Sequence, residues 1–196
     1  MKKRTIFNLI LVAIIGLLIF ILIKSIQEPI AFKEELDKRR DAVVEKLIEI
    51  RTAQKAYYGM KSEYANDFAT LKNALANDTF KIINVIGDPD DPNSGEVVYD
   101  TTYVLAADSI AAIGLSLDSL EFVPYGGGKT FKIAADTIRS QKTLVNVVEV
   151  GIQWKDFMGK YGTERFQKYD KNYKPNDILK FGDLNKPTLS GNWESK

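Results

Sequence analysis

Residues 6–23 read IFNLILVAIIGLLIFILI, an apolar run in which Asn8 is the only strongly polar residue and no charge occurs before Lys24. A helix rises about 1.5 Å per residue, so about 20 apolar residues cross a hydrocarbon core of about 30 Å. The run reaches that length. Residues 2–4 are Lys-Lys-Arg, and short basic flanks stay in the cytoplasm. We therefore expect residues 1–24 to form a cytoplasmic tip and a transmembrane helix in the inner membrane.

A cleaved secretory signal is the alternative interpretation of this run. Signal peptides have apolar cores of about 7–15 residues, followed by small residues at a cleavage site. Here the core is longer and leads into residues 23–28, Ile-Lys-Ser-Ile-Gln-Glu, where no such site is evident. We expect the segment to be retained as an anchor, with the rest of the chain in the periplasm.

Composition limits what the exported part does. The 196-residue chain leaves about 170 residues beyond the anchor, enough for one domain of ordinary size. Lys plus Arg is 27 and Asp plus Glu is 26, so no basic excess points to a nucleic acid partner. The chain has no His and no Cys, which excludes Ser-His-Asp triads, Cys-His dyads and the usual zinc sites. We expect a protein without enzymatic activity or cofactor.

After the apolar run, residues 25–60 change to an amphipathic pattern and predict a helical rod. Pro29 either begins a new helix or lies within a continuous one. Steps of four and three, the spacing of one helix face, separate the residues Val43, Leu47, Ile50, Gln54 and Tyr57. This face either packs on its own domain or forms a coiled coil with other copies. The repeat lasts only two or three heptads, which favours the chain's own domain.

Residues 61–196 are expected to form an α+β domain with a polar C-terminal tail. Asn66 or Asp67 is placed to cap a short helix carrying Phe68, Leu71 and Leu75. Beyond it, β-branched and aromatic residues predict strands at 80–86, 97–105, 120–123, 130–134 and 145–152. Residues 125–129, Tyr-Gly-Gly-Gly-Lys, read as a hairpin turn. The tail beyond Trp154 is expected to be loop, lying over the sheet through Phe157, Tyr161, Phe166 and Tyr169. A helix followed by antiparallel strands is typical of an α+β fold.

Two further groups of residues carry candidate sites. Tyr57, Tyr58, Tyr64 and Phe68 suit either an aromatic ligand site or the packing of the helix end on the sheet, which we favour because aromatic rings bury large areas. Calcium prefers oxygen ligands, and an oxygen-rich cluster lies in one turn. Its residues are Asp88, Asp90, Asp91, Asn93 and Glu96. Their spacing does not match the EF-hand, and exposed turns use the same residue types, so calcium is a speculative ligand.

With these elements placed, the chain resembles type IV pilin-like and pseudopilin-like proteins. The resemblance rests on the basic start, the apolar helix 6–23 and its amphipathic continuation through residues 47–58, LIEIRTAQKAYY. Residues 61–65, KSEYA, and 68–71, FATL, are similar to the segment that follows the pilin helix. That family is processed after a Gly that precedes a short stretch leading to Glu. Gly16 is followed by Leu-Leu-Ile-Phe-Ile and no Glu, so the resemblance implies an unprocessed relative on a fixed anchor.

These features together predict a single-pass membrane protein with a structural or assembly role in an envelope complex. The rod would hold the β domain away from the lipid, and partners would be envelope proteins or other copies of the chain. We expect the helix face of Val43, Leu47 and Ile50 to carry these contacts. The alternative is an extracytoplasmic ligand-binding or sensory module, which requires a pocket with converging polar groups.

Overall fold

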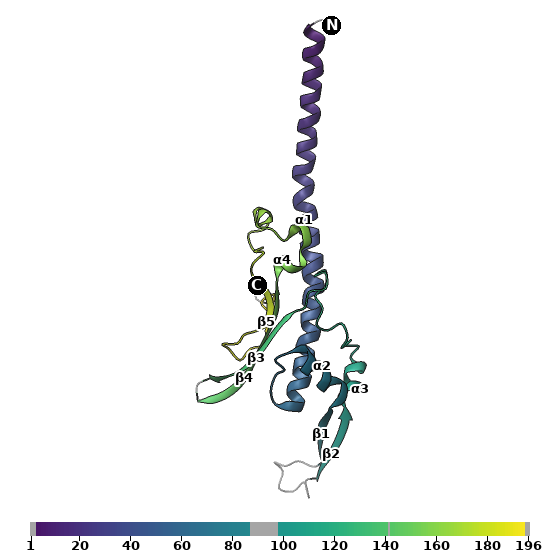
Figure 1. Ribbon diagram of the computed structural model, residues 1–196, viewed down its shortest axis with the longest axis vertical. Helices are drawn as coiled ribbons and strands as arrows, with labels where there is room; N and C mark the ends of the chain where they lie inside the picture. Colours follow the sequence, from purple (N-terminus) through teal and green to yellow (C-terminus); the bar gives the residue numbers. More distant parts are fainter. Residues whose placement is uncertain (1–2, 87–97, 141, 195–196) are drawn as a thin grey trace.

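The computed structural model describes residues 3–86, 98–140 and 142–194. Its spine is α1 (Lys3–Lys61), a helix of 59 residues that is about 89 Å long at 1.5 Å per residue. The helix continues through Pro29, although proline has no N–H to donate to the preceding turn. The first half of α1 stands clear of the rest of the molecule, and all other elements gather around its second half (Figure 1).

The apolar segment 6–23 has no protein cover. Its large apolar side chains are between 45% exposed, at Ile6, and 65% exposed, at Phe7 and Val12. By length and composition this part of α1 is suited to cross a membrane, and none of its most apolar stretch is buried in the protein. Every backbone donor in a helix interior is satisfied within the helix, which is what a hydrocarbon environment requires.

The second half of α1 has one buried face, as its periodicity predicts. The buried residues are Phe32, Leu36, Val43, Leu47, Ile50, Ala53, Gln54 and Tyr57. Two layers cover this face from opposite sides, helices α2 and α3 on one and a β-sheet on the other (Figure 1). The expectation that the stripe packs on its own domain is therefore confirmed.

One layer begins directly after α1. It contains α2 (Phe68–Asn77), β1 (Thr79–Ile86), β2 (Val98–Leu105) and α3 (Ala106–Ala112). Of the two predicted cap candidates, Asp67 caps α2, and its carboxylate accepts a hydrogen bond of 2.7 Å from the backbone N–H of Thr70. β1 and β2 pair antiparallel and form a sheet of their own. The sequence predicted both strands but not α3.

The other layer is an antiparallel sheet in the order β3-β4-β5, with bounds β3 (Lys132–Ser140), β4 (Thr143–Gln153) and β5 (Ile178–Gly182). The predicted hairpin over 120–134 is wrong in its extent. A single bridge joins Phe122 to Thr130 around the turn, and the strand beyond it pairs with β4. Gly127 and Gly128 both have positive φ, which tightens the turn so that the chain leaves it towards β4.

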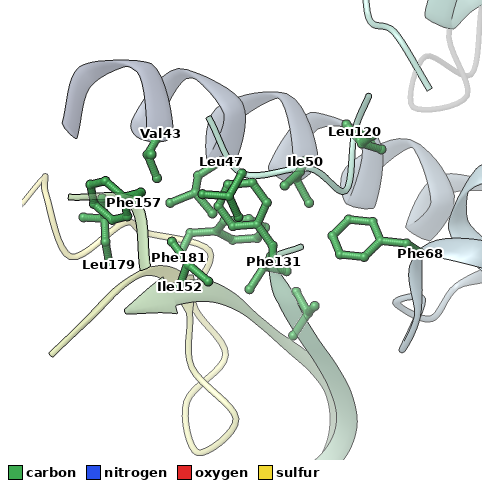
Figure 2. Packing of buried hydrophobic residues seen from close by; sticks show 14 of the residues in the cluster. Val43, Leu47, Ile50, Phe68, Leu120, Phe131, Ile152, Phe157, Leu179 and Phe181 are labelled. Carbon is green, nitrogen blue, oxygen red and sulfur yellow. The ribbon is translucent and has the colours of Figure 1, made fainter. Parts of the chain in front are cut away.

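The core lies between α1 and this sheet. Figure 2 shows Val43, Leu47 and Ile50 on the side of α1 that faces Phe131, Ile152, Phe157, Leu179 and Phe181. Register explains the apolar face of the sheet, because Val150 opposes both Ile133 and Phe181 and directly opposed residues share a face. Val150 and Phe181 are fully buried.

The C-terminal tail is ordered by packing on α1. It forms α4 (Trp154–Phe157), η1 (Gly159–Tyr161) and η2 (Glu164–Lys168) before β5. Four of its rings surround Phe32 of α1, at centroid distances of 5.7, 5.3, 6.0 and 5.2 Å for Tyr161, Phe166, Tyr169 and Tyr173. The expectation of a loop lying over the sheet is thus corrected. Phe32 provides the apolar surface that these aromatic residues need.

Candidate interaction site

The end of the molecule opposite the apolar segment carries a projecting two-stranded ribbon. We call β1 and β2 together the distal ribbon. It extends beyond the end of α1 and away from both core layers (Figure 1). Two strands alone are marginally stable in water, so the distal ribbon depends on contacts at its base or on a partner.

The base of the distal ribbon is fixed to the helices. Lys61 at the end of α1 forms an ion pair of 2.9 Å with Asp78, and this hydrogen bond raises the pKa of Lys61. The backbone carbonyl of Asp78 also accepts a hydrogen bond of 2.9 Å from Ala106 at the start of α3. Phe80 lies against Gly59 and is half-buried. One end of the ribbon is therefore held by the helices.

One face of the distal ribbon exposes several large apolar side chains, next to Lys81, which opposes Tyr103. In β2, Tyr99, Tyr103 and Leu105 alternate with Asp100, Thr102 and Val104, so the first three lie on the same face. Ile83 of β1 opposes Thr101 and joins that face. The four apolar residues Ile83, Tyr99, Tyr103 and Leu105 are 50%, 62%, 65% and 50% exposed.

Both strands of the distal ribbon are also sheet edges. An edge strand presents unpaired N–H and C=O groups that pair readily with another chain. An exposed apolar face beside such edges is typical of a protein interaction site, and β-strand addition is a recurring way to use it. The sequence predicted these strands but did not single out the four residues, although the alternation from Tyr99 to Leu105 is readable from it.

The helix face expected to bind partners is in the core instead. Val43, Leu47 and Ile50 are each 0% exposed within this single chain, facing the sheet (Figure 2). Their side chains are already covered, so they stabilise the domain and are not available to a partner. The prediction of Val43, Leu47 and Ile50 as interaction residues is corrected on this ground.

The aromatic residues near the end of α1 are divided between core and surface. Tyr57 and Phe68 are buried, and burial raises the pKa of Tyr57. Tyr58 and Tyr64 form a ring pair at 4.7 Å, with Tyr58 39% exposed. These contacts favour the packing interpretation over a ligand site, and they join the end of α1 to the loop before α2.

A polar cleft of about 340 Å³ next to these rings is the candidate pocket for a ligand-binding function. It lies between the end of α1 and the β3–β4 hairpin, and Asn146 lines it. The side-chain amide of Asn146 donates 2.6 Å to the carbonyl of Ser62 and accepts 2.7 Å from the Thr137 hydroxyl. These hydrogen bonds join the end of α1 to the β3–β4 hairpin across the cleft.

The proposed calcium ligands Asp88, Asp90, Asp91, Asn93 and Glu96 lie outside the described residues. Among the residues that are described, no cluster of three or more carboxylates is arranged to hold a metal ion. Comparisons with protein-family models, curated proteins and solved structures found no match for this chain. A functional assignment therefore depends on the geometry of the molecule itself.

Proposed function

We propose that this chain is a single-pass inner-membrane protein that holds its α+β domain on the extracytoplasmic side and binds a protein partner through the distal ribbon. In this proposal the role is structural, in the assembly of an envelope complex, and not enzymatic. The pilin-like plan suggested by the sequence fits it, with α1 as a permanent anchor.

The observation that carries the proposal is the position of two exposed apolar surfaces at opposite ends of one rigid helix. The apolar segment 6–23 is bare on all sides, and the distal ribbon exposes Tyr99 and Tyr103 beyond the other end. From Lys24 to Lys61, α1 spans about 55 Å at 1.5 Å per residue. A membrane at one end would therefore leave the ribbon far out in the periplasm, where a partner can reach it.

The orientation follows from charge. Lys2, Lys3 and Arg4 precede the apolar segment, and the cytoplasmic flank of a membrane helix is normally the more basic one. The support for a non-enzymatic role comes from composition, because a chain without His and Cys has no Ser-His-Asp triad or Cys-His dyad.

Photocrosslinking in membranes tests the proposal. A photoreactive residue in place of Tyr103, which is 65% exposed, should give a discrete protein adduct in cells that express the full chain. Leu144 is the matched control, because it is 66% exposed on the other β-hairpin. The mass of the adduct distinguishes a second copy of the chain from a different protein.

Substitution of the ribbon face provides a second measurement. A crosslinker at Ile83 combined with Tyr99→Ser and Tyr103→Ser should yield much less adduct, while the melting temperature of the domain stays unchanged because both rings are exposed. Two results would overturn the assignment of the ribbon as the binding site. One is an equal yield of adduct from photoreactive residues at Tyr103 and Leu144. The other is no adduct from a photoreactive residue at Tyr99 and none from one at Tyr103.

A further inference from the structure

A hollow of about 780 Å³ lies where α1 leaves the domain towards the apolar segment. Lys24 and Gln27 of α1 line one side, and Lys160, Thr163 and Arg165 of the C-terminal tail line the other. In Figure 1 this part of the tail is the portion of the domain nearest to the bare half of α1. We call these five residues the collar.

The collar carries an excess of positive charge. Arg165 forms an ion pair with Glu28, and the Tyr169 hydroxyl donates a second hydrogen bond of 2.7 Å to the same carboxylate, so that acid is satisfied. Within the described residues, Lys24 and Lys160 form no ion pair. Their ammonium groups lie over aromatic rings, Lys24 at 5.0 Å from Phe20 and Lys160 at 4.8 Å from Tyr161.

Lys160 has a longer-range electrostatic interaction with one carboxylate, that of Glu35. It contributes to lowering the pKa of Glu35, but the Glu35 carboxylate is already bound by Arg39 at 2.7 Å. Two ammonium groups in the collar therefore keep hydrogen-bond donors for an anion from outside the protein. The guanidinium of Arg165, whose side chain is 63% exposed, lies beside them.

The depth of the collar follows from the helix rise. From Ile23, the last residue of the apolar segment, to Gln27 of the collar is about 6 Å at 1.5 Å per residue. The headgroup region adds about 5–8 Å to each side of a hydrocarbon core of about 30 Å. If the apolar segment fills that core, as the proposed function states, the collar lies at the level of the lipid phosphates.

We propose that the collar binds the phosphate headgroup of an anionic phospholipid, an inference that rests on the proposed membrane anchor. Lys and Arg side chains are the usual partners of phosphate oxygens, and an anionic lipid surface attracts basic residues next to a membrane helix. A phospholipid fits better than free phosphate because the bilayer that would hold the apolar segment places lipid phosphates next to the collar. The lipid would seat the domain upright on its anchor.

The test uses the full chain in detergent with one fluorescent label. The protein has no cysteine, so Thr163→Cys creates a unique attachment point inside the hollow, at a side chain that makes no helix-capping bond. The probes are short-chain phosphatidylglycerol, short-chain phosphatidylcholine and inorganic phosphate. Phosphatidylglycerol should change the label signal in a saturable way, and phosphatidylcholine should not.

Removal of the charges of Lys24 and Lys160 should weaken the binding of phosphatidylglycerol by a defined factor. Lys24→Gln with Lys160→Gln should raise the half-saturating concentration of phosphatidylglycerol about 25-fold, from about fivefold for each basic residue near an anionic surface. The charge-matched control is Lys142→Gln with Lys186→Gln, two exposed lysines outside the collar, and it should leave the titration unchanged. All four side chains are exposed, so the fold should be retained.

Three results would overturn the inference. They are no saturable signal with phosphatidylglycerol, equal weakening by both double variants, and saturation by inorganic phosphate in the same concentration range. Flotation of the unlabelled chain with phosphatidylcholine vesicles tests the anchor separately. A chain that floats but shows no lipid-dependent signal contradicts the collar alone, whereas a chain that does not float contradicts the proposed function.

Discussion

Along α1, residues 6–30 and residues 32–61 belong to one uninterrupted helix but meet different surroundings. In the first region every large apolar side chain is at least 45% exposed, and Ile30, the last of them along the chain, is 62% exposed. In the second region the apolar side chains of one face are at most 5% exposed, from Phe32 to Tyr57. The backbone is the same in both regions, so the arrangement of apolar residues around the helix makes the difference.

This contrast shows how periodicity selects the environment of a helix. A stripe at steps of three and four leaves a polar face for water and buries one side in a protein core. An apolar surface on all sides has no polar face, and it is stable only where the surroundings are apolar in every direction. The boundary falls between Lys24, the first charged residue after the apolar segment, and Phe32, the first fully covered ring.

The largest expected effect comes from placing charges in the bare region. Ile14→Arg with Leu18→Arg should remove membrane insertion, because an arginine at the centre of a membrane helix costs about 2.5–3.5 kcal/mol, or about 5–7 kcal/mol for the pair. The domain should keep its melting temperature, since both side chains are exposed. Flotation with vesicles measures insertion.

The same change in the covered region is the control for that prediction. Ile48→Arg with Thr52→Arg has the same spacing on the exposed side of the second region, where Ile48 is 41% exposed. This variant should float as the unmodified chain does. If the Ile14 and Leu18 variant also floats, the distinction between the two regions of α1 is wrong.

Loss of the first covered ring should be the next largest effect. Phe32→Ala should destabilise the domain by about 3–5 kcal/mol, because the ring is fully buried among four aromatic residues of the tail. Denaturant titration followed by tryptophan fluorescence is suitable, since Trp154, one of the two tryptophans, contacts Tyr173 of the same cluster at 5.9 Å. Phe20→Ala is the matched control on the same helix, and a loss of similar size there would contradict the comparison.

A buried polar residue in the covered stripe should give a smaller effect. Gln54 is fully buried and forms two hydrogen bonds with the backbone of Ala65, donating 2.9 Å to its carbonyl and accepting 3.0 Å from its N–H. Gln54→Leu keeps the approximate volume but leaves both backbone groups without a partner, at a cost of about 2–3 kcal/mol. Thermal unfolding measures this cost. Lys55→Leu changes the exposed neighbour and should be nearly neutral, whereas equal losses would show that the buried bonds contribute nothing.

The same periodicity explains how much of this fold was predictable. Residues 43–57 repeat over four turns of helix, and the helix, its buried face and Asp67 as one of two candidate caps were all found. β5 was missed because its five residues lie in a polar tail. Its burial arises from pairing with β4, for example Phe181 with Val150, far away in sequence. Strand preference of this kind depends on tertiary neighbours.

The proposed interaction site was less predictable than the fold. Alternation places Tyr99 and Tyr103 on one face of a strand, but it does not say whether another layer covers that face. Coverage depends on the ribbon extending beyond the end of α1, which is a property of the whole arrangement. For the same reason Val43, Leu47 and Ile50 were predicted as partner contacts, although the sheet occupies them.

The smallest expected effect lies where the covered region of α1 gives way to α2. Asp67→Ala should cost about 1 kcal/mol, because the carboxylate caps the helix through the N–H of Thr70. Asp67→Asn should lose only part of this, since an amide oxygen also accepts a hydrogen bond. The measurement is thermal unfolding of the full chain in detergent at neutral pH.

The pH dependence of this cap separates a charged cap from a merely polar one. The hydrogen bond from Thr70 lowers the pKa of Asp67 below its ordinary value near 3.8, so the unfolded chain binds a proton more readily than the folded one. The contribution of Asp67 is therefore complete above that ordinary value and is lost as the pH falls through the lower folded value. The difference in unfolding free energy between the unmodified chain and Asp67→Asn should shrink on acidification below about pH 4. A difference that stays constant down to the folded pKa would mean that the carboxylate charge adds nothing to the hydrogen bond.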